Sequence, residues 1–440
     1  MSGAIDAILP KIQSMIEDRK LASLHPERRK IDLGTAENAL LHPEITRIYL
    51  DALKKGLENY KFLPYPEGFG GDPELVNALA MFFNKYFRPQ QKVSGSQIVV
   101  ASGATSCLES MLHCICDPGE AVLVPAPYWS MSTPLLILKH KNNSGVVDGF
   151  NVTFSIRPSA RIIPVGCDGS LGDTLSSIDF FESSLKSAIS TSEFRIRALV
   201  LTNPHNPFGR CYTKGMVELC ARFCQKYNIH FISDEVYALS VFEGDELNHS
   251  SALQLDLKAL EVDPDRVHVI WSTSKDFGSS GVRVGAIVSQ ANERLRASLA
   301  LASNIQVSSL AAIATTGLLN CPELDQLIIL NRQRLRRAHK TITAFFKANG
   351  IHYLPATAGP FIFAKLPGNL SSLEDEQRAV DAISSTGLTV SPGSNYAWSK
   401  REFGWVRITF AVEPSVLDQG LERLVRGLKI QELRSQSFGY

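Results

Sequence analysis

The segment Trp271-Ser-Thr-Ser-Lys275-Asp-Phe-Gly-Ser-Ser-Gly-Val-Arg283-Val-Gly285 decides how this 440-residue chain folds around a reactive group. Its lysine lies among small residues, directly after the apolar segment 267–271. A strand therefore delivers the amine to a flexible turn, and the small neighbours leave room beside it for a large molecule. A lysine in such a place can form a Schiff base with an aldehyde cofactor.

The composition is that of an ordinary globular enzyme, with 44% hydrophobic and 20% charged residues. Lys and Arg (45) nearly balance Asp and Glu (44), and the net charge of +1 argues against nucleic acid as a partner. Residues 1–20 lack the apolar core of a signal peptide, and no apolar run is long enough to cross a membrane. We expect a cytoplasmic protein. The eight scattered cysteines match no zinc pattern, so reduced thiols and no metal site are expected.

From about residue 73, helical patterns alternate with short apolar strands. The expected helices include 73–86, 104–115 and 214–227, with apolar residues at helical spacing. Strands separated by helices predict an α/β fold with a mostly parallel sheet covered on both sides. Ligands of such sheets bind at the carboxyl ends of the strands, where the polar clusters of this chain lie.

After about residue 310 the pattern changes to that of a smaller α+β domain. Its expected elements are a helix at 322–348, a strand at 361–364, a helix near 377–385, a strand at 406–410 and a last helix from 415. We expect the chain to divide into an N-terminal arm that joins the small domain (1–45), a large cofactor-binding domain (46–315) and the small domain (316–440).

Polar residues at the strand ends could bind a cofactor with a pyridine ring. Asp234 could pair with a protonated ring nitrogen, which makes the ring an electron sink. Tyr237 and Asn206 could bind the phenolic oxygen. Trp129 could stack on the ring, and Tyr128 is the alternative residue for that stacking contact.

Other residues suit a phosphate and a carboxylate. The segment Ser102-Gly-Ala-Thr105 opens a helix, whose backbone amides and dipole favour an anion. Ser272 and Arg283 flank the lysine as further phosphate donors. Arg407 could hold an amino-acid carboxylate with two hydrogen bonds.

Six motifs occur together in one order: Gly34-Thr-Ala-Glu-Asn38, Ser102-Gly-Ala-Thr105, Asn203-Pro-His-Asn-Pro207, Ser233-Asp-Glu-Val-Tyr237, Ser272-Thr-Ser-Lys-Asp276 and Ser391-Pro-Gly-Ser394. In this set the chain resembles the class-I/II aminotransferases, which are pyridoxal-phosphate (PLP) enzymes of fold type I. It is most similar to their 1-aminocyclopropane-1-carboxylate (ACC) synthase branch. The resemblance covers nearly the whole chain and implies a seven-stranded type of sheet in the large domain.

The resemblance also implies a role for each site residue. Lys275 would form the internal aldimine. The residues expected around the cofactor are Asp234 at the ring nitrogen, Tyr237 and Asn206 at the phenolic oxygen, and Ala104, Thr105, Ser272 and Arg283 at the phosphate. Arg407 and Glu37 would bind the amino-acid substrate. Tyr65 resembles the tyrosine that reaches the phosphate of the neighbouring subunit, which implies a homodimer with shared active sites.

Four of these residues have a simpler interpretation. Asp234 could cap a helix, and Trp129 could be ordinary core packing. Arg283 could pair with a structural carboxylate. A surface or capping role is as plausible for Glu37 as a substrate contact.

The chain departs from the ACC synthase pattern after Trp129. About eighteen extra residues, 131–148, are either a lineage-specific loop or a retained intron in the gene model. Asn151-Val152-Thr153 stands where ACC synthases carry an Asp-Arg-Asp segment, which weakens the case for cyclising S-adenosylmethionine. Arg157 matches an arginine that the family carries later in this segment.

The fold alone does not choose the reaction. We expect an aminotransferase, similar to members of fungal secondary-metabolite pathways. A carbon–sulfur lyase on a cysteine conjugate comes second and ACC synthase third. An inactive PLP-family binding subunit is the alternative outside the enzymes, against which the intact Lys275 and Asp234 argue.

Overall fold

The computed structural model describes residues 30–58, 62–65, 67–129, 160–166, 177–243, 249–397 and 402–437, with side chains as far as Gln431. The expected insertion 131–148 and most of the expected arm lie outside these residues. The helices are α2 His42–Gly56, α3 Pro73–Tyr86, α4 Gly103–Ile115, α7 Ile178–Ser190, α8 Lys214–Tyr227, α9 Thr273–Asp276, α10 Glu293–Ala302, α11 Ser309–Leu319, α12 Leu324–Ala348, α13 Leu373–Ser385 and α14 Pro414–Ser437. The strands are β1 Ile31–Asp32, β2 Ile98–Ala101, β3 Ala121–Pro125, β4 Tyr128–Trp129, β5 Arg161–Val165, β6 Ile196–Thr202, β7 His230–Asp234, β8 Val267–Ser272, β9 Gly285–Val288, β10 His352–Leu354, β11 Phe361–Lys365, β12 Leu388–Thr389, β13 Ser391–Pro392, β14 Tyr396–Ala397 and β15 Trp405–Thr409.

Capping residues explain where the helices begin. α3 and α8 have the predicted bounds, because Asp72 and Thr213 accept hydrogen bonds from the first free amides of these helices. The helix expected near 377–385 begins earlier, at Leu373, because the side chain of Ser372 accepts a hydrogen bond from the amide of Asp375. Its first turn is acidic, which suits the positive end of the helix dipole.

The large sheet has seven strands in the order β2-β9-β8-β7-β6-β3-β5. The strands from β8 to β5 pair in parallel, while β9 runs antiparallel to both β8 and β2. The predicted mostly parallel α/β sheet is confirmed.

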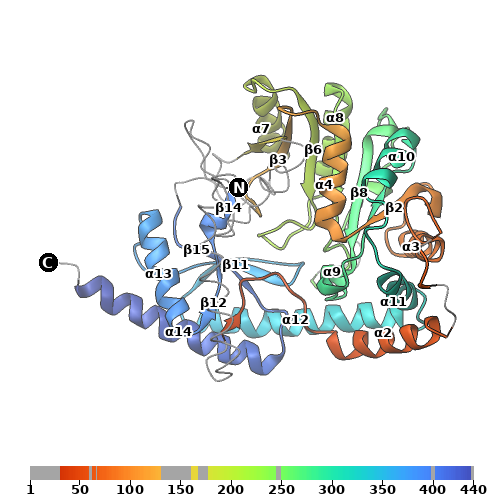
Figure 1. Cartoon of the computed structure of the whole chain (residues 1–440). Helices are drawn as coiled ribbons and strands as arrows, with labels where there is room; N and C mark the ends of the chain where they lie inside the picture. The colour runs from red at the N-terminus through yellow and green to blue at the C-terminus, as the bar shows by residue number, and fades with distance from the viewer. Residues whose placement is uncertain are drawn as a thin grey trace, which may run out of the picture.

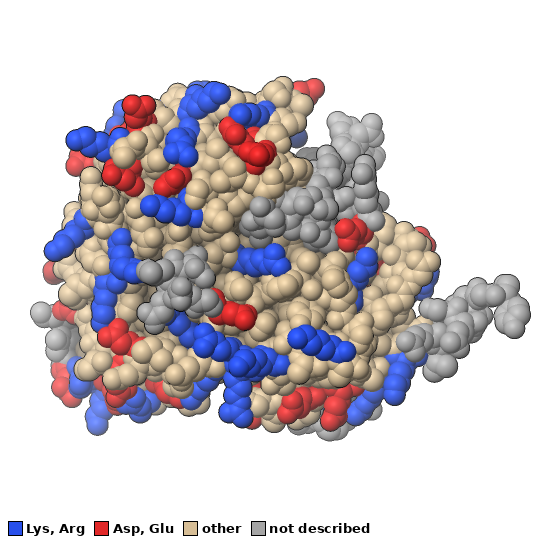
Figure 2. All heavy atoms as spheres, turned by 180° about the vertical axis from the view of Figure 1, so that it is seen from behind, with Lys and Arg blue, Asp and Glu red and all other residues tan. Residues whose placement is uncertain are grey.

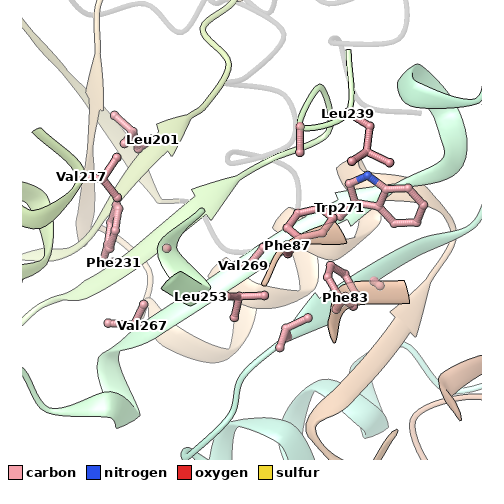
Figure 3. Packing of buried hydrophobic residues seen from close by; sticks show 14 of the residues in the cluster. Phe83, Phe87, Leu201, Val217, Phe231, Leu239, Leu253, Val267, Val269 and Trp271 are labelled. Carbon is pink, nitrogen blue, oxygen red and sulfur yellow. The ribbon is translucent and has the colours of Figure 1, made fainter. Parts of the chain in front are cut away.

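Helices cover both faces of this sheet (Figure 1). Successive residues of a strand point to opposite faces, so Leu199 packs in one core cluster and Val200 in another. α3, α7, α8 and α11 supply the first cluster, and α4 and α10 supply the second. Figure 3 shows the first cluster at the end of β8, where Phe83 of α3 and Phe87, directly after this helix, lie beside Trp271. This packing holds the segment that carries Lys275.

A smaller antiparallel sheet, in the order β10-β11-β15-β13, forms the second core. α13, α14 and the second half of α12 pack on it, and Leu33 and Leu40 of the N-terminal segment join them. α12 runs along both cores (Figure 1), because Leu327 packs with the large sheet and Ile342 with the small one. The division at residues 45/46 and 315/316 stays a proposal.

The surface carries both signs of charge. On the face shown in Figure 2, basic and acidic side chains are both spread over the molecule. Among the described helices, none combines the length and apolar character that a membrane crossing requires.

Candidate active site

A cavity of about 520 Å³ lies at the carboxyl ends of β6, β7 and β8, against the small sheet. Thr202, Asp234 and Ser272, at the ends of the three strands, all border it. Eleven of the residues predicted from the sequence line this one cavity: Glu37, Ala104, Thr105, Trp129, Asn206, Asp234, Tyr237, Ser272, Lys275, Arg283 and Arg407. Tyr65 does not line it.

Lys275 lies on α9, a single helical turn directly after β8. Its Nζ donates a hydrogen bond of 2.8 Å to the carbonyl of Ala36 in the N-terminal segment. Burial lowers the pKa of this amine, and the positive charges of Arg407 and Arg283 act in the same direction. The carboxylate of Glu37 opposes them. A lowered pKa leaves more of the amine neutral and nucleophilic near pH 7.

Asp234 ends β7, next to Thr202 of β6 in the ladder. Its Oδ1 is buried and has no hydrogen-bond partner among the described residues. Removal from water raises the pKa of this carboxyl to about 7. A positively charged N–H donor in the cavity would satisfy the oxygen and restore the ionised form.

The first turn of α4 and the segment after Lys275 form an anion-binding end of the cavity. Arg283 donates to the carbonyls of Ser280 and Ser102 at 2.9 and 2.8 Å. Only glycine fits at position 103, because φ is +83° there and an added Cβ would lie 2.3 Å from Nη2 of Arg283. The hydroxyl of Ser272 is buried without a partner among the described residues. An anion placed here would receive donors from α4, Ser272 and Arg283.

Arg407 lines the cavity from β15 of the small sheet and is 2% exposed. It donates to Oδ1 of Asn206 at 2.9 Å and to the carbonyl of Gly34 at 2.6 Å. Its guanidinium lies 4.8 Å from the centre of the Phe361 ring. Nε is buried and has no partner in the described structure, so it can still bind a carboxylate.

Aromatic side chains border the middle of the cavity. Trp129 of β4 lines it, whereas its neighbour Tyr128 is buried and does not. Tyr237 also lines it, packs edge to face on Phe361 at 5.4 Å, and has a pKa raised by burial. Tyr65 is 80% exposed.

The sequence did not indicate the groups that hold Lys275 and Arg407 in place. These are the carbonyls of Ala36 and Gly34 and the ring of Phe361. Carbonyls are present at every residue and leave no signal in a sequence. The departures at 151–153 and at Arg157 lie outside the described residues.

Comparison with known proteins identifies the family. The model of the aminotransferase class I and II family matches residues 28–140 and 174–424. The chain belongs to this family. The resemblance predicted from the motifs is thereby confirmed.

Among curated class I/II aminotransferase relatives, the chain is 42% identical to the probable aminotransferase aclI of Aspergillus oryzae, over 96% of this chain and 95% of the relative. It is 33% identical to the probable aminotransferase gliI of Aspergillus fumigatus (92% and 91% covered). It is 29% identical to 1-aminocyclopropane-1-carboxylate synthase 7 of Arabidopsis thaliana (90% and 86% covered). Among solved structures, aspartate aminotransferase from Thermus thermophilus with maleate shares the fold, with a TM-score of 0.72, 21% identity and 97% and 99% of the chains covered.

Pyridoxal phosphate is the cofactor of this aminotransferase family, and the residues present fit it. Unpartnered Oδ1 of Asp234 suits a protonated ring nitrogen. The unpartnered hydroxyl of Ser272 and the guanidinium of Arg283, which lies against Gly103, suit a phosphate. Lys275 lies in the same cavity as both.

Proposed function

We propose that the chain is an aminotransferase that removes the amino group of a free α-amino acid. One observation carries the proposal: Arg407 and Lys275 line one cavity and hold carbonyls two residues apart, those of Gly34 and Ala36. A carboxylate bound to Arg407 would bring the neighbouring amino group to the reactive end of Lys275.

Bound pyridoxal phosphate supplies an aldehyde that reacts with amines and a ring that stores the electrons of a broken C–H bond. Asp234 would keep the ring nitrogen protonated. Lys275 would hold the cofactor through its amine and would act as the general base that takes the α-proton of the substrate and returns it. Asn206 would serve both the substrate and the cofactor, since it accepts a hydrogen bond from Arg407 and lines the same cavity as Tyr237.

The other site roles belong to the same proposal. Ala104, Thr105, Ser272 and Arg283 would bind the phosphate, and Trp129 would stack on the ring. Glu37 would contact the substrate, because it borders the cavity and its charge acts on the amine of Lys275.

The proposed enzyme is a homodimer in which Tyr65 reaches the partner subunit's phosphate site. Tyr65, Leu63 and Phe69 expose large apolar or aromatic surfaces, and so do Leu301 and Ile305. Gly68, Gly70 and Ile305 line one small cavity. The exposed side chains at 63–69 therefore lie next to those at 301–305. A second copy of this chain would cover them. Light scattering of the pure protein tests this, since a monomer at micromolar concentration contradicts it.

A cytoplasmic location and a place in secondary metabolism complete the proposal. The second rests on similarity to fungal relatives such as aclI and gliI, which are named probable aminotransferases.

Incubation with single substrates tests the reaction type. Alanine alone is expected to give pyruvate and to leave its amino group on the cofactor; an added acceptor keto acid is expected to take up that amino group and sustain turnover. Thiol, pyruvate and ammonia from an S-substituted cysteine would show a carbon–sulfur lyase instead, and methylthioadenosine from S-adenosylmethionine would show ACC synthase. A protein that binds the cofactor but converts none of the three would support the inactive binding subunit.

A further inference from the structure

Two buried asparagines lie beneath the turn that carries Lys275. Asn38 belongs to the N-terminal segment and is fully buried, and Asn331 lies in the middle of α12 and is 1% exposed. Neither is among the residues that line the cavity. Their side-chain amides therefore bind other groups of the protein and not a ligand in the cavity.

These amides hold the main chain of the lysine turn. Nδ2 of Asn38 donates to the carbonyl of Lys275 at 3.1 Å and to Oδ1 of Asn331 at 3.0 Å. Nδ2 of Asn331 donates to the carbonyl of Asp276 at 3.2 Å. Oδ1 of Asn38 accepts from the amide of Leu40 at 3.2 Å. The network thus binds two successive carbonyls of a one-turn helix that is too short to satisfy them itself.

Without this network, burial of the Asn331 side-chain amide would destabilise the folded protein. It lies on the buried face of α12 between Leu327 and Leu335, where an apolar side chain would pack without desolvating an amide. A buried polar residue in such a place is accounted for by the groups that it binds, and here these are the carbonyls of the lysine turn.

The same segment that carries Asn38 also touches the amine. The carbonyl of Ala36, two residues earlier, accepts the hydrogen bond of 2.8 Å from Nζ of Lys275. The backbones at Asn38 and Gly278 are in close contact, since a Cβ added at Gly278 would lie 1.9 Å from the carbonyl oxygen of Asn38. The distance between Ala36 and Lys275 is therefore set by the contacts of Asn38.

We propose that Asn38 and Asn331 are positioning residues for Lys275: their buried amides hold the carbonyl of Ala36 against the lysine nitrogen and so favour the protonated form of that nitrogen. The inference rests on the proposed function, in which Lys275 carries the cofactor. A carbonyl that accepts a hydrogen bond from a charged N–H stabilises the charge. Glu37 and Asp234 also favour the charge, and Arg283 and Arg407 oppose it.

The test is a pH titration of the visible absorbance of bound pyridoxal phosphate in the purified holoenzyme. Asn331→Leu removes the two hydrogen bonds that Asn331 makes, to Asn38 and to the carbonyl of Asp276, with little change in volume. Asn38→Ser removes the amide that binds the carbonyl of Lys275 and leaves a small polar group. Both variants are expected to lower the midpoint of the titration by about 0.5 unit, which is about threefold in proton affinity.

Leu335→Ala is the matched control, because Leu335 is a fully buried residue on the same helix face, and its apolar side chain packs in the core of the small sheet and can donate or accept none of these hydrogen bonds. It is expected to lower the melting temperature without moving the midpoint. If the asparagine variants melt earlier but titrate as the wild type does, the network is structural and the inference is overturned. A wild-type protein without the absorbance band would instead overturn the proposed function.

Discussion

Two carboxylates beside Lys275, the buried Asp276 and the half-buried Asp234, differ in what binds them. Asp276 receives hydrogen bonds from the hydroxyl of Ser240 at 2.7 Å, the indole of Trp271 at 2.9 Å and the amide of Leu239 at 3.2 Å. Asp234 borders the cavity, and its Oδ1 has no partner in the described part of the chain. Burial raises the pKa of both, to about 6 for Asp276 and about 7 for Asp234.

The comparison shows that burial and a shifted pKa do not by themselves identify a ligand-binding carboxylate. Asp276 has donors on both oxygens and ties the lysine turn to the segment 239–240. Asp234 keeps one buried oxygen for a partner that the described chain does not supply. We expect Asp276 to act on stability and Asp234 on cofactor binding, and substitutions should separate the two effects.

The largest effect is expected from Lys275→Ala. Loss of the nucleophile and general base should lower turnover by at least about a thousandfold and abolish the visible absorbance band of the bound cofactor. The fold should persist, because the substitution removes a buried amine whose pKa is lowered by burial. Absorbance and thermal melting of one preparation check this; turnover within tenfold of the wild type would contradict the role of Lys275.

Asp234→Asn should reduce activity by about a hundredfold, because the ring nitrogen loses a charged partner. The cofactor-free variant should nevertheless be more stable than the cofactor-free wild type at pH 8, since it no longer buries an ionised carboxylate. Steady-state kinetics and calorimetry measure the two effects. An unstable variant with normal activity would show that Asp234 stabilises the fold, as Asp276 is expected to do, and does not act on the cofactor.

Asp276→Asn should show the opposite pattern. The amide offers one acceptor to donors that now bind two carboxylate oxygens, so stability should fall by about 2 kcal/mol. Urea denaturation measures this loss, and the cofactor absorbance should remain visible at low temperature. If stability were unchanged and the absorbance lost, Asp276 would act on the cofactor instead.

The smallest expected effect is on how the melting temperature depends on pH. The pKa of Asp234 lies at about 7 in the folded protein and at its ordinary value of 3.8 when exposed, so protonation favours the folded state. Its contribution is present below pH 4 and is lost as the pH rises to 7. The melting temperature of the cofactor-free protein should therefore fall by a few degrees more between pH 5 and pH 8 than that of Asp234→Asn. Equal slopes would show that Asp234 is ionised at both pH values.

Much of the fold could be predicted from local sequence. The bounds of α3 and α8 follow from apolar spacing and from Asp72 and Thr213, which act within a few residues along the chain. Alternating strands and helices predicted the mostly parallel sheet. The motifs also predicted which side chains share a cavity, because strand ends of such a sheet meet at one edge.

The sequence by itself determined the elements and the kinds of side chain brought to the cavity, because periodicity, caps and motifs act over short distances. Only the tertiary structure decided which polar groups have partners. Asp234 and Asp276 each belong to one of the six motifs, but no motif shows that two of the three donors to Asp276 come from residues 239 and 240, about forty residues away. Asn38 and Asn331 are 293 residues apart, so no local pattern could pair them. Partners of this kind depend on how the two sheets and α12 pack, and that packing leaves Asp276 with donors on both oxygens and Asp234 with an unpartnered oxygen at the cavity.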